Sequence, residues 1–465
     1  MISWRDALAE LNDGLVGPLF VAGSAGYEDE VAVFNQAVTH QPAVVVGAQR
    51  ATDVSKSVEF ASRHGLDVGV LNTGHGPSVP AGASTLMITT RRMAAVEIDA
   101  ENRTARVEAG VRFGQLVAAA AVHGLAPLAG SSPGVGVVGY TLAGGASATM
   151  GRRYGWAADH VTALEVVSAD GQLRRVTPHS DADLFGALLG AKSNFGVVTA
   201  LECAVFPVTQ LYAGSLFFSG ERTREVLGAY REFTATAPEE ISTGVALLNF
   251  PPLPHLPLFM RGKLAVAVRI SYIGDPEEGK RLIAPLRQAA PVVMDTVTEI
   301  PYTGFGSITD DPSDPAPAVE HFGVLRELTE EAIDAIVAVA GPTADSPINL
   351  VDIRHLGGAY SRPAPVPNAV GARDAAFAYF ALTVVPPGHE VADYRDCGRE
   401  LTTALSPWLC EQAHPSFLGP DDATESRTRR AYDRDTYHQL QILKAKYDPH
   451  NIFRTNHNIT PNGIA

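Results

Sequence analysis

The chain has 465 residues, of which 46% are hydrophobic and 19% are charged. This length exceeds what one compact core holds, so we expect a globular protein of two domains. The formal net charge of −15 opposes nonspecific binding to nucleic acid or anionic lipid, because both are polyanions.

The N-terminal segment, MISWRDALAEL, is typical of an amphipathic helix with acidic side chains. It lacks the basic and then apolar regions of a signal peptide, so we expect a cytoplasmic protein. The sequence contains no run of about 18 apolar residues, so we expect no membrane span. Cys203, Cys397 and Cys410 have no CxxC spacing, which argues against a zinc site or a disulfide framework. The fourteen histidines form no HxH or HExxH set, so a metal hydrolase has little support.

Residues 1–208 alternate strands and helices at the spacing of α/β units. The expected elements are, in chain order, a strand at 42–48, a helix capped by Asp53 and stopped by Gly65, strands at 66–71 and 86–90, hairpins that turn at Asn102 and at Asp170-Gly171, a helix over 180–189 and a strand over 196–208.

The pattern changes at residue 209 and indicates an α+β domain through residue 418, an antiparallel sheet with helices on one side. The expected elements are strands at 214–220, 263–274 and 375–385, helices near 222–235, 329–340 and 389–405, and Pro- and Gly-rich loops at 250–262, 310–318 and 361–371 that are candidate walls of a site. Residues 419–465 form a third, C-terminal segment.

The stretch Asn72-Thr73-Gly74-His75-Gly76 follows the strand at 66–71. Glycine permits positive φ and a close approach of the backbone to a ligand, and successive N–H groups in such a turn form a nest for a pyrophosphate. A second Gly-rich segment runs from Gly130 to Gly145. Two such loops in one domain suggest a long dinucleotide between them. The fingerprint G-x-G-x-x-G with a later acidic residue is missing, so a Rossmann NAD site is not supported.

Several motifs then follow one another in a specific order. They are Tyr27…Phe34-Asn35…Pro42, Asp53-Val54…Phe60-Ala61, the TGHG turn, the Gly-rich segment ending in LAGG, Tyr154-Gly155…Asp159, Gly190…Asn194-Phe195-Gly196-Val197-Val198-Thr199 and the tail Lys446-Tyr447-Asp448-Pro449…Asn451…Phe453-Arg454…Asn456-His457-Asn458. This order resembles the berberine-bridge-enzyme-like branch of the FAD-linked oxidases. The resemblance covers both ends of the chain and is weak through the middle third.

The resemblance implies a PCMH-type, two-part FAD-binding domain over 1–208, to which residues 419–465 return, beside the α+β substrate domain. It implies FAD contacts from Asn72, Thr73, Gly74, His75, Gly76, Ser131, Ser132, Val135, Gly136, Tyr140, Gly144, Gly145, Asn194, Gly196, Val198, Asn456 and Asn458. Taken singly, the glycines among them are also compatible with ordinary turns.

In the resembled family the TGHG histidine bonds covalently to the 8α-methyl of the flavin, so we expect this bond at His75 rather than an ordinary turn histidine. Many relatives add a second bond through a cysteine that precedes proline, where this chain has Ser132. We therefore expect one covalent bond. Val135 matches the position that gates oxygen, where valine resembles the oxidases; a packed loop valine is the alternative.

The catalytic base is less clear from the sequence. The family often has a tyrosine where this chain has His414, and histidine can accept a proton near neutral pH. A surface histidine beside proline is the alternative for His414. Tyr379 and His355 are further candidates, and a core aromatic or a histidine that holds the sheet beside the flavin are their alternatives.

The resemblance thus implies an FAD-dependent oxidase that takes hydride from an alcohol carbon of a small, secondary-metabolite-like substrate and passes the electrons to O2, forming H2O2. Amine oxidation of the nicotine-oxidising type is the alternative, and oxidative C–C bond formation remains open. A flavin-containing protein that only binds a small molecule is a rival from another class. The sequence does not determine the oligomeric state.

Overall fold

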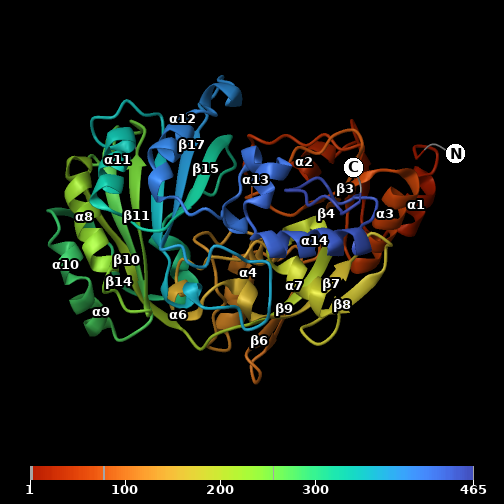
Figure 1. Ribbon diagram of the computed structural model, residues 1–465, viewed down its shortest axis with the longest axis horizontal. Helices are drawn as coiled ribbons and strands as arrows, with labels where there is room; N and C mark the ends of the chain where they lie inside the picture. The colour runs from red at the N-terminus through yellow and green to blue at the C-terminus, as the bar shows by residue number, and fades with distance from the viewer. Residues whose placement is uncertain (1–3, 77–78, 255, 464–465) are drawn as a thin grey trace.

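The computed structural model describes residues 4–76, 79–254 and 256–463. Three sheets build two parts of the molecule, which lie side by side (Figure 1). The N-terminal part holds two sheets and also receives the C-terminus, while residues from the middle of the chain form the third sheet. Among the described residues, none of the helices is both long and apolar enough to cross a membrane.

The first sheet has four strands in the order β1-β2-β4-β3. They are β1 (Leu19–Val21), β2 (Val44–Gly47), β4 (Thr85–Thr89) and β3 (Asp67–Leu71). β2 and β3 both pair with β4 in parallel, and helix α3 (Ala51–His64) connects them. Gly65 ends this helix with a φ of 68°, as the sequence predicts.

The expectation that Asp53 caps α3 is wrong, because Asp53 lies inside the helix and the N-cap is Arg50. Its fully buried carboxylate accepts hydrogen bonds from the backbone N–H groups of Val16, Gly17 and Gln49 at 3.0–3.1 Å. Asp53 therefore fixes the N-terminal loop onto the sheet.

The second sheet is antiparallel and has five strands in the order β5-β6-β9-β7-β8. They are β5 (Val96–Asp99), β6 (Thr104–Glu108), β9 (Val197–Ala204), β7 (Val161–Val167) and β8 (Leu173–Val176). The two expected hairpins are β5–β6 and β7–β8. Helices α4 (Phe113–Ala121), α5 (Val137–Leu142) and α7 (Ala182–Ala191) share one hydrophobic core with this sheet.

The third sheet is antiparallel, with eight strands along the path β13-β10-β12-β11-β16-β17-β15, and β14 also pairs with β10. The strands are β10 (Gln210–Ser219), β11 (Ile241–Asn249), β12 (Leu264–Tyr272), β13 (Val292–Asp295), β14 (Thr298–Pro301), β15 (Ala318–Leu325), β16 (Leu350–His355) and β17 (Phe377–Val384). The sequence patterns had indicated only β10, β12 and β17.

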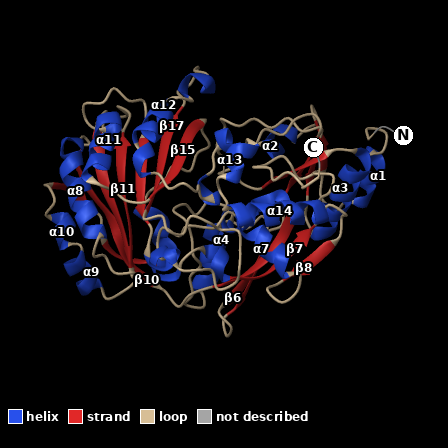
Figure 2. Ribbon diagram, in the orientation of Figure 1, coloured by secondary structure: helices blue, strands red, loops and turns tan. Residues whose placement is uncertain are grey.

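Helices cover one face of the third sheet (Figure 2). They are α8 (Thr223–Thr234), α9 (Pro276–Leu282), α10 (Ala284–Arg287), α11 (Glu330–Ala340) and α12 (Cys397–Ala404). The helix expected over 389–405 begins only at Cys397. Along β16, Val351 and Ile353 enter the core beneath these helices, while Asp352 points to the opposite face. That opposite face meets the N-terminal part and forms a wall of the site.

Short elements complete the fold. The remaining helices are α1 (Leu8–Gly14), α2 (Tyr27–Val31), α6 (Gly151–Tyr154), α13 (Glu425–Arg429) and α14 (Arg434–Tyr447). The 3₁₀ turns are η1 (Ala157–His160), η2 (Lys192–Asn194), η3 (Gly220–Arg222), η4 (Tyr302–Ile308), η5 (Gly358–Ser361), η6 (Val391–Tyr394), η7 (Ser406–Trp408), η8 (Pro415–Phe417) and η9 (Pro420–Asp422).

The C-terminal segment is fixed by a buried ion pair between Lys444 of α14 and Asp448. Lys444 Nζ donates to Asp448 Oδ2 at 2.7 Å and to the carbonyls of Asn194 and Phe453. The Asp448 carboxylate in turn accepts from two backbone N–H groups. Both charges are fully hydrogen-bonded, which is what a buried pair needs to be stable.

Replacing Lys444 with Met should destabilise the protein by about 3–5 kcal/mol, because Asp448 becomes a buried charge without its partner. Urea unfolding followed by circular dichroism measures the change. Lys446→Met, on the exposed face of the same helix, is the matched control and should change stability by less than about 0.5 kcal/mol. Equal effects of the two variants would contradict the role of the pair.

Candidate active site

His75 lies just beyond the end of β3, in the TGHG turn. Gly74 has a φ of 68°, and a Cβ there would approach Val33 to 2.5 Å, so the turn needs glycine. The His75 ring stacks on Phe34 with centroids 4.0 Å apart, and its Nδ1 bonds with Thr73 Oγ1 at 2.8 Å. These contacts orient the imidazole.

Burial, and then the nearby Arg112, lower the pKa of His75 to about 4. The imidazole is therefore neutral at pH 7. When Nδ1–H donates to Thr73, the free lone pair is on Nε2. A neutral ring nitrogen with an available lone pair is what a nucleophile requires.

The Gly-rich segment faces His75. Backbone hydrogen bonds hold the segment in place, from Phe113 N to Val135 O at 3.0 Å and from Gly114 N to Pro133 O at 2.9 Å. A Cβ on Gly134 would lie 3.6 Å from His75 Nε2 and 3.6 Å from Ser132 Oγ. The structure thus brings the two predicted loops together. Ser132 occupies the position of the expected family cysteine, and its side chain lies close to the space beside His75 Nε2.

The glycines of the LAGG turn, Gly144 and Gly145, lie beside two further predicted site residues, His414 and Tyr140. Gly144 and Gly145 have φ angles of 118° and 76°. A Cβ on Gly144 would come within 2.8 Å of His414 Cε1, and one on Gly145 within 2.8 Å of Tyr140 Cε1. Because these glycines have no side chains, the rings of His414 and Tyr140 can pack closely against the turn.

Four of the predicted cofactor residues carry buried polar atoms with no hydrogen-bond partner among the described residues. They are the side-chain oxygens of Asn72, Tyr140, Asn456 and Asn458. Such atoms are rare in folded proteins, and each needs an explanation. All four belong to the two loops or to the C-terminal segment, which fits a polar ligand held between these elements.

Three other predicted cofactor residues have structural roles. Asn194 donates to the carbonyls of Ala191 and His457 and accepts from Ile459 N, so its amide holds the C-terminal segment. A Cβ on Gly196 would lie 2.4 Å from the carbonyl oxygen of Val167, so this glycine permits close strand packing. Val198 is buried in the core of the second sheet. The expected FAD contacts of these three residues stay predictions beside these structural roles.

His414 is buried, and its ring stacks on Trp156 with centroids 4.0 Å apart. Its Nδ1 accepts a hydrogen bond from Ser416 N at 3.0 Å, so the neutral ring carries its proton on Nε2. Nε2 has no partner among the described residues. Burial, and then Arg373 and Lys192, lower the pKa of His414 to about 3. His414 thus presents a hydrogen-bond donor.

His355 follows the same logic on β16. Arg152 Nη1 donates to its Nε2 at 2.9 Å, so the proton of the neutral ring lies on Nδ1. Nδ1 is buried without a partner among the described residues. Burial and Arg152 lower the pKa of His355 to about 3. With these partners neither His355 nor His414 has a free lone pair, which argues against their predicted role as acceptor of the substrate proton.

Tyr379 lies on the opposite face of the sheet. Its side chain belongs to the core beneath the helices, where its hydroxyl donates to Thr402 Oγ1 at 2.8 Å. Burial raises the pKa of Tyr379 to about 12. This position favours the alternative of a core aromatic over the predicted catalytic role.

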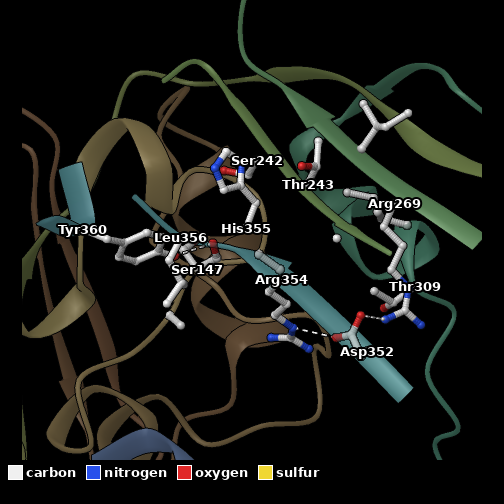
Figure 3. Close-up of a pocket in the computed structure, with 15 residues that line it drawn as sticks. Ser147, Ser242, Thr243, Arg269, Thr309, Asp352, Arg354, His355, Leu356 and Tyr360 are labelled. Carbon is white, nitrogen blue, oxygen red and sulfur yellow. Dashed lines mark hydrogen bonds and ion pairs between the residues drawn. The ribbon is translucent and has the colours of Figure 1, made fainter. Parts of the chain in front are cut away.

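A cavity lies between residues 146–148, which follow the LAGG turn, and the face of the third sheet that points away from the helices (Figure 3). Asp352 bridges two arginines on its floor: Arg269 Nη1 lies 3.0 Å from Oδ1 and Arg354 Nε lies 2.7 Å from Oδ2. His355 lines the same cavity. Sequence reasoning missed the two arginines and Asp352; the only signal was the D-x-R spacing, which places Asp352 and Arg354 on one face of a strand.

Glu320 is another titratable residue that the sequence did not reveal. It lies on β15, and burial raises the pKa of its carboxyl to about 7. Its Oε2 has no hydrogen-bond partner among the described residues. It does not line the cavity that contains His355.

Two family profiles match the chain, "FAD binding domain" over residues 42–177 and "Berberine and berberine like" over residues 416–460. In the sequence, the two matched stretches flank the residues of the third sheet. The first stretch includes both loops that face each other at His75. The chain is a berberine-bridge-enzyme-like FAD-linked oxidoreductase with a PCMH-type FAD-binding domain. The family and the fold class predicted from the sequence are confirmed.

Relatives match this berberine-bridge-enzyme-like chain over nearly its whole length. The (R)-6-hydroxynicotine oxidase of Paenarthrobacter nicotinovorans is 25% identical over 97% of this chain and 100% of its own. The chitooligosaccharide oxidase of Gibberella zeae is 25% identical over 96% and 92%, respectively. The structure of BBE-like 1 from Physcomitrella patens has a TM-score of 0.85 and covers 100% of both chains at 17% identity, so it shares the fold.

FAD is the cofactor of this berberine-bridge-enzyme-like protein, and the site fits it. The TGHG turn and the Gly-rich segment leave room for the backbone to approach a ligand, and the four orphaned oxygens offer hydrogen bonds. His414 adds an unpaired N–H donor beside Gly144. These residues would hold FAD when it is bound.

Acid should destabilise the protein through its buried histidines. Burial lowers the pKa of both His414 and His457 to about 3, from an ordinary value of 6.5. Below pH 6.5 the unfolded chain therefore binds protons that the folded chain does not, and at pH 5 each histidine should cost about 2 kcal/mol of stability. His414→Gln should remove about that much of the difference between pH 7 and pH 5.

Urea unfolding at the two pH values measures this difference. His123→Gln, at an exposed position, is the matched control and should leave the pH dependence unchanged. An unaltered dependence in His414→Gln would show that His414 is not held neutral in the folded protein.

Proposed function

We propose that the protein is an FAD-dependent oxidase that takes hydride from an alcohol carbon of a small, secondary-metabolite-like substrate, with O2 as the electron acceptor and H2O2 as a product. The relatives from Paenarthrobacter nicotinovorans and Gibberella zeae, both oxidases by name, support this class of reaction. Bound FAD supplies the hydride acceptor and the route of electrons to O2. The protein supplies positioning and charge.

We further propose that FAD is attached through His75 alone. The observations in favour are the neutral imidazole, oriented by Phe34 and Thr73, and its Nε2 beside Gly134. Ser132 has no thiol with which to make a second bond. Cys203, Cys397 and Cys410 are free cysteines that lie on other elements, outside this loop.

The positive charge of the cavity wall is the observation that carries the choice of an alcohol. Arg152 donates to His355 and to the carbonyls of Ile241 and Ala237, and among the described residues no carboxylate lies within ion-pair distance of it. Arg269 and Arg354 share Asp352 alone. In the lining of the cavity two arginines thus face one carboxylate, and Arg152 adds a third cation next to His355, outside that lining; this positive charge disfavours a protonated amine.

The same charge supports alcohol chemistry. As hydride leaves the alcohol carbon and the hydroxyl gives its proton to a water molecule, negative charge develops on the oxygen, and fixed cations and N–H donors stabilise it. His355 lines the cavity, and its buried Nδ1–H has no partner among the described residues, so we propose it as the donor to that oxygen. His355 thus orients the substrate as a donor.

Amine oxidation is the second candidate function. The relative named (R)-6-hydroxynicotine oxidase favours it. Hydride transfer from a neutral amine also needs no base. This fits a site in which neither predicted histidine has a lone pair to accept a proton. A protein that only binds its ligand is the third reading, which bound flavin without turnover would support.

His75→Ala should abolish the covalent bond. The visible flavin colour of the wild-type protein should stay in the pellet after acid precipitation, while essentially all of it should pass to the supernatant for the variant. His123→Ala, at an exposed position, is the control and should behave as wild type. Wild-type colour in the supernatant would exclude the covalent bond and leave the FAD assignment intact.

Peroxide release should identify the reaction. In a panel of small alcohols and amines, an alcohol should give the highest rate, and His355→Leu should lower kcat/KM for it about tenfold or more, because one hydrogen bond to the reacting oxygen is lost. Tyr379→Phe is the control and should stay within about twofold of wild type. Turnover of amines alone would overturn the alcohol proposal; flavin without any turnover would favour the binding protein.

A further inference from the structure

The floor of the cavity has two arginines on either side of a glycine. Gly244 of β11 pairs with Arg269 of β12 on one side and with Arg354 of β16 on the other. A Cβ on Gly244 would already lie 3.5 Å from Asp352 Oδ1. The glycine therefore leaves the space between the two arginine stems free of a side chain.

The two arginines differ in accessibility. The side chain of Arg269 is 10% exposed and that of Arg354 is 27% exposed. Arg354 uses Nε for Asp352, and among the described residues no hydrogen bond involves its terminal nitrogens Nη1 and Nη2. The negative charge of Asp311 interacts electrostatically with the guanidinium of Arg354, but among the described residues the two side chains form no ion pair. Arg354 thus keeps two donors and part of its charge for a ligand.

The neighbouring polar groups are also unpaired. Ser242 lines the cavity, and its buried hydroxyl has no partner among the described residues. Ser271, its cross-strand neighbour, has a buried hydroxyl in the same condition. This wall thus offers the Ser242 hydroxyl and the terminal nitrogens of Arg354 as donors, and its one carboxylate, Asp352, is already held by two arginines.

We propose that this wall binds the carboxylate of the substrate, so that the substrate is a small hydroxy acid. Arg354 donates to the carboxylate and Ser242 completes its hydrogen bonds, since arginine with adjacent donors matches the two oxygens of a planar anion. His355, the next residue on β16, donates to the hydroxyl that is oxidised. The substrate class rests on the proposed oxidase function, whereas carboxylate binding by itself does not.

The first experiment compares benzoate and benzamide, two probes of the same shape that differ in charge, by isothermal titration calorimetry on the purified holoenzyme. Benzoate should bind at least about tenfold more tightly than benzamide. Arg354→Gln should abolish that preference and leave benzamide affinity within about twofold. Arg222→Gln, an exposed arginine on the surface of the same domain, is the control and should keep the preference.

Milder variants cover the event that Arg354→Gln does not fold. Arg354→Lys keeps the charge but loses the forked geometry, and Ser242→Ala removes one hydroxyl; each should weaken benzoate binding about fivefold and leave benzamide unchanged. Equal affinity for the two probes in the wild type, or an unchanged benzoate affinity in all three variants, would overturn the carboxylate site.

Peroxide assays then separate this inference from the proposed function. Hydroxy acids should be oxidised at least about tenfold faster, in kcat/KM, than their methyl esters. Faster oxidation of the esters would reject the substrate class and keep the oxidase. Tight benzoate binding without turnover of any alcohol would keep the carboxylate site, while rejecting the oxidase and the substrate class that depends on it.

Discussion

The return of the C-terminal segment to β3 is the contact on which the rest of the site depends. Lys444 and Asp448 fix the turn that carries residues 452–454, and the carbonyl of Ile452 accepts from Val68 N in β3. Arg454 adds an ion pair with Asp67 at 2.7 Å. Because β3 leads directly into the TGHG turn, the far end of the chain helps to set the position of His75.

The sequence predicts the parts of this structure that local chemistry dictates. Glycines that need positive φ marked both FAD loops, and buried apolar runs marked the strands of the first sheet. Much of the third sheet escaped prediction, because β11 and β16 carry polar residues on one face and apolar residues on the other within a sheet that is buried on both sides. Roles that depend on distant partners also escaped it, such as that of Asn194, whose amide bonds to residues 457 and 459.

Two histidines show why residue type alone does not define a catalytic role. His355 and His414 were both reasonable bases from their sequence context. In the fold, a single donor bonded to one ring nitrogen of each, Arg152 in one case and Ser416 N in the other, places the proton on the opposite nitrogen. Burial then keeps both rings neutral, so they act as donors. The partner atom decides the chemistry of the imidazole.

The alternation of side chains along β16 has an evolutionary consequence. Asp352 and Arg354 face the cavity, whereas Val351 and Ile353 support the core beneath the helices. Substitutions at Arg354 alter what the cavity recognises without disturbing the apolar packing on which folding depends, and they leave Asp352 paired with Arg269. A lineage can therefore explore new substrates on this strand while its stability is conserved, which suits a scaffold that serves substrates as different as an alkaloid and an oligosaccharide in its named relatives.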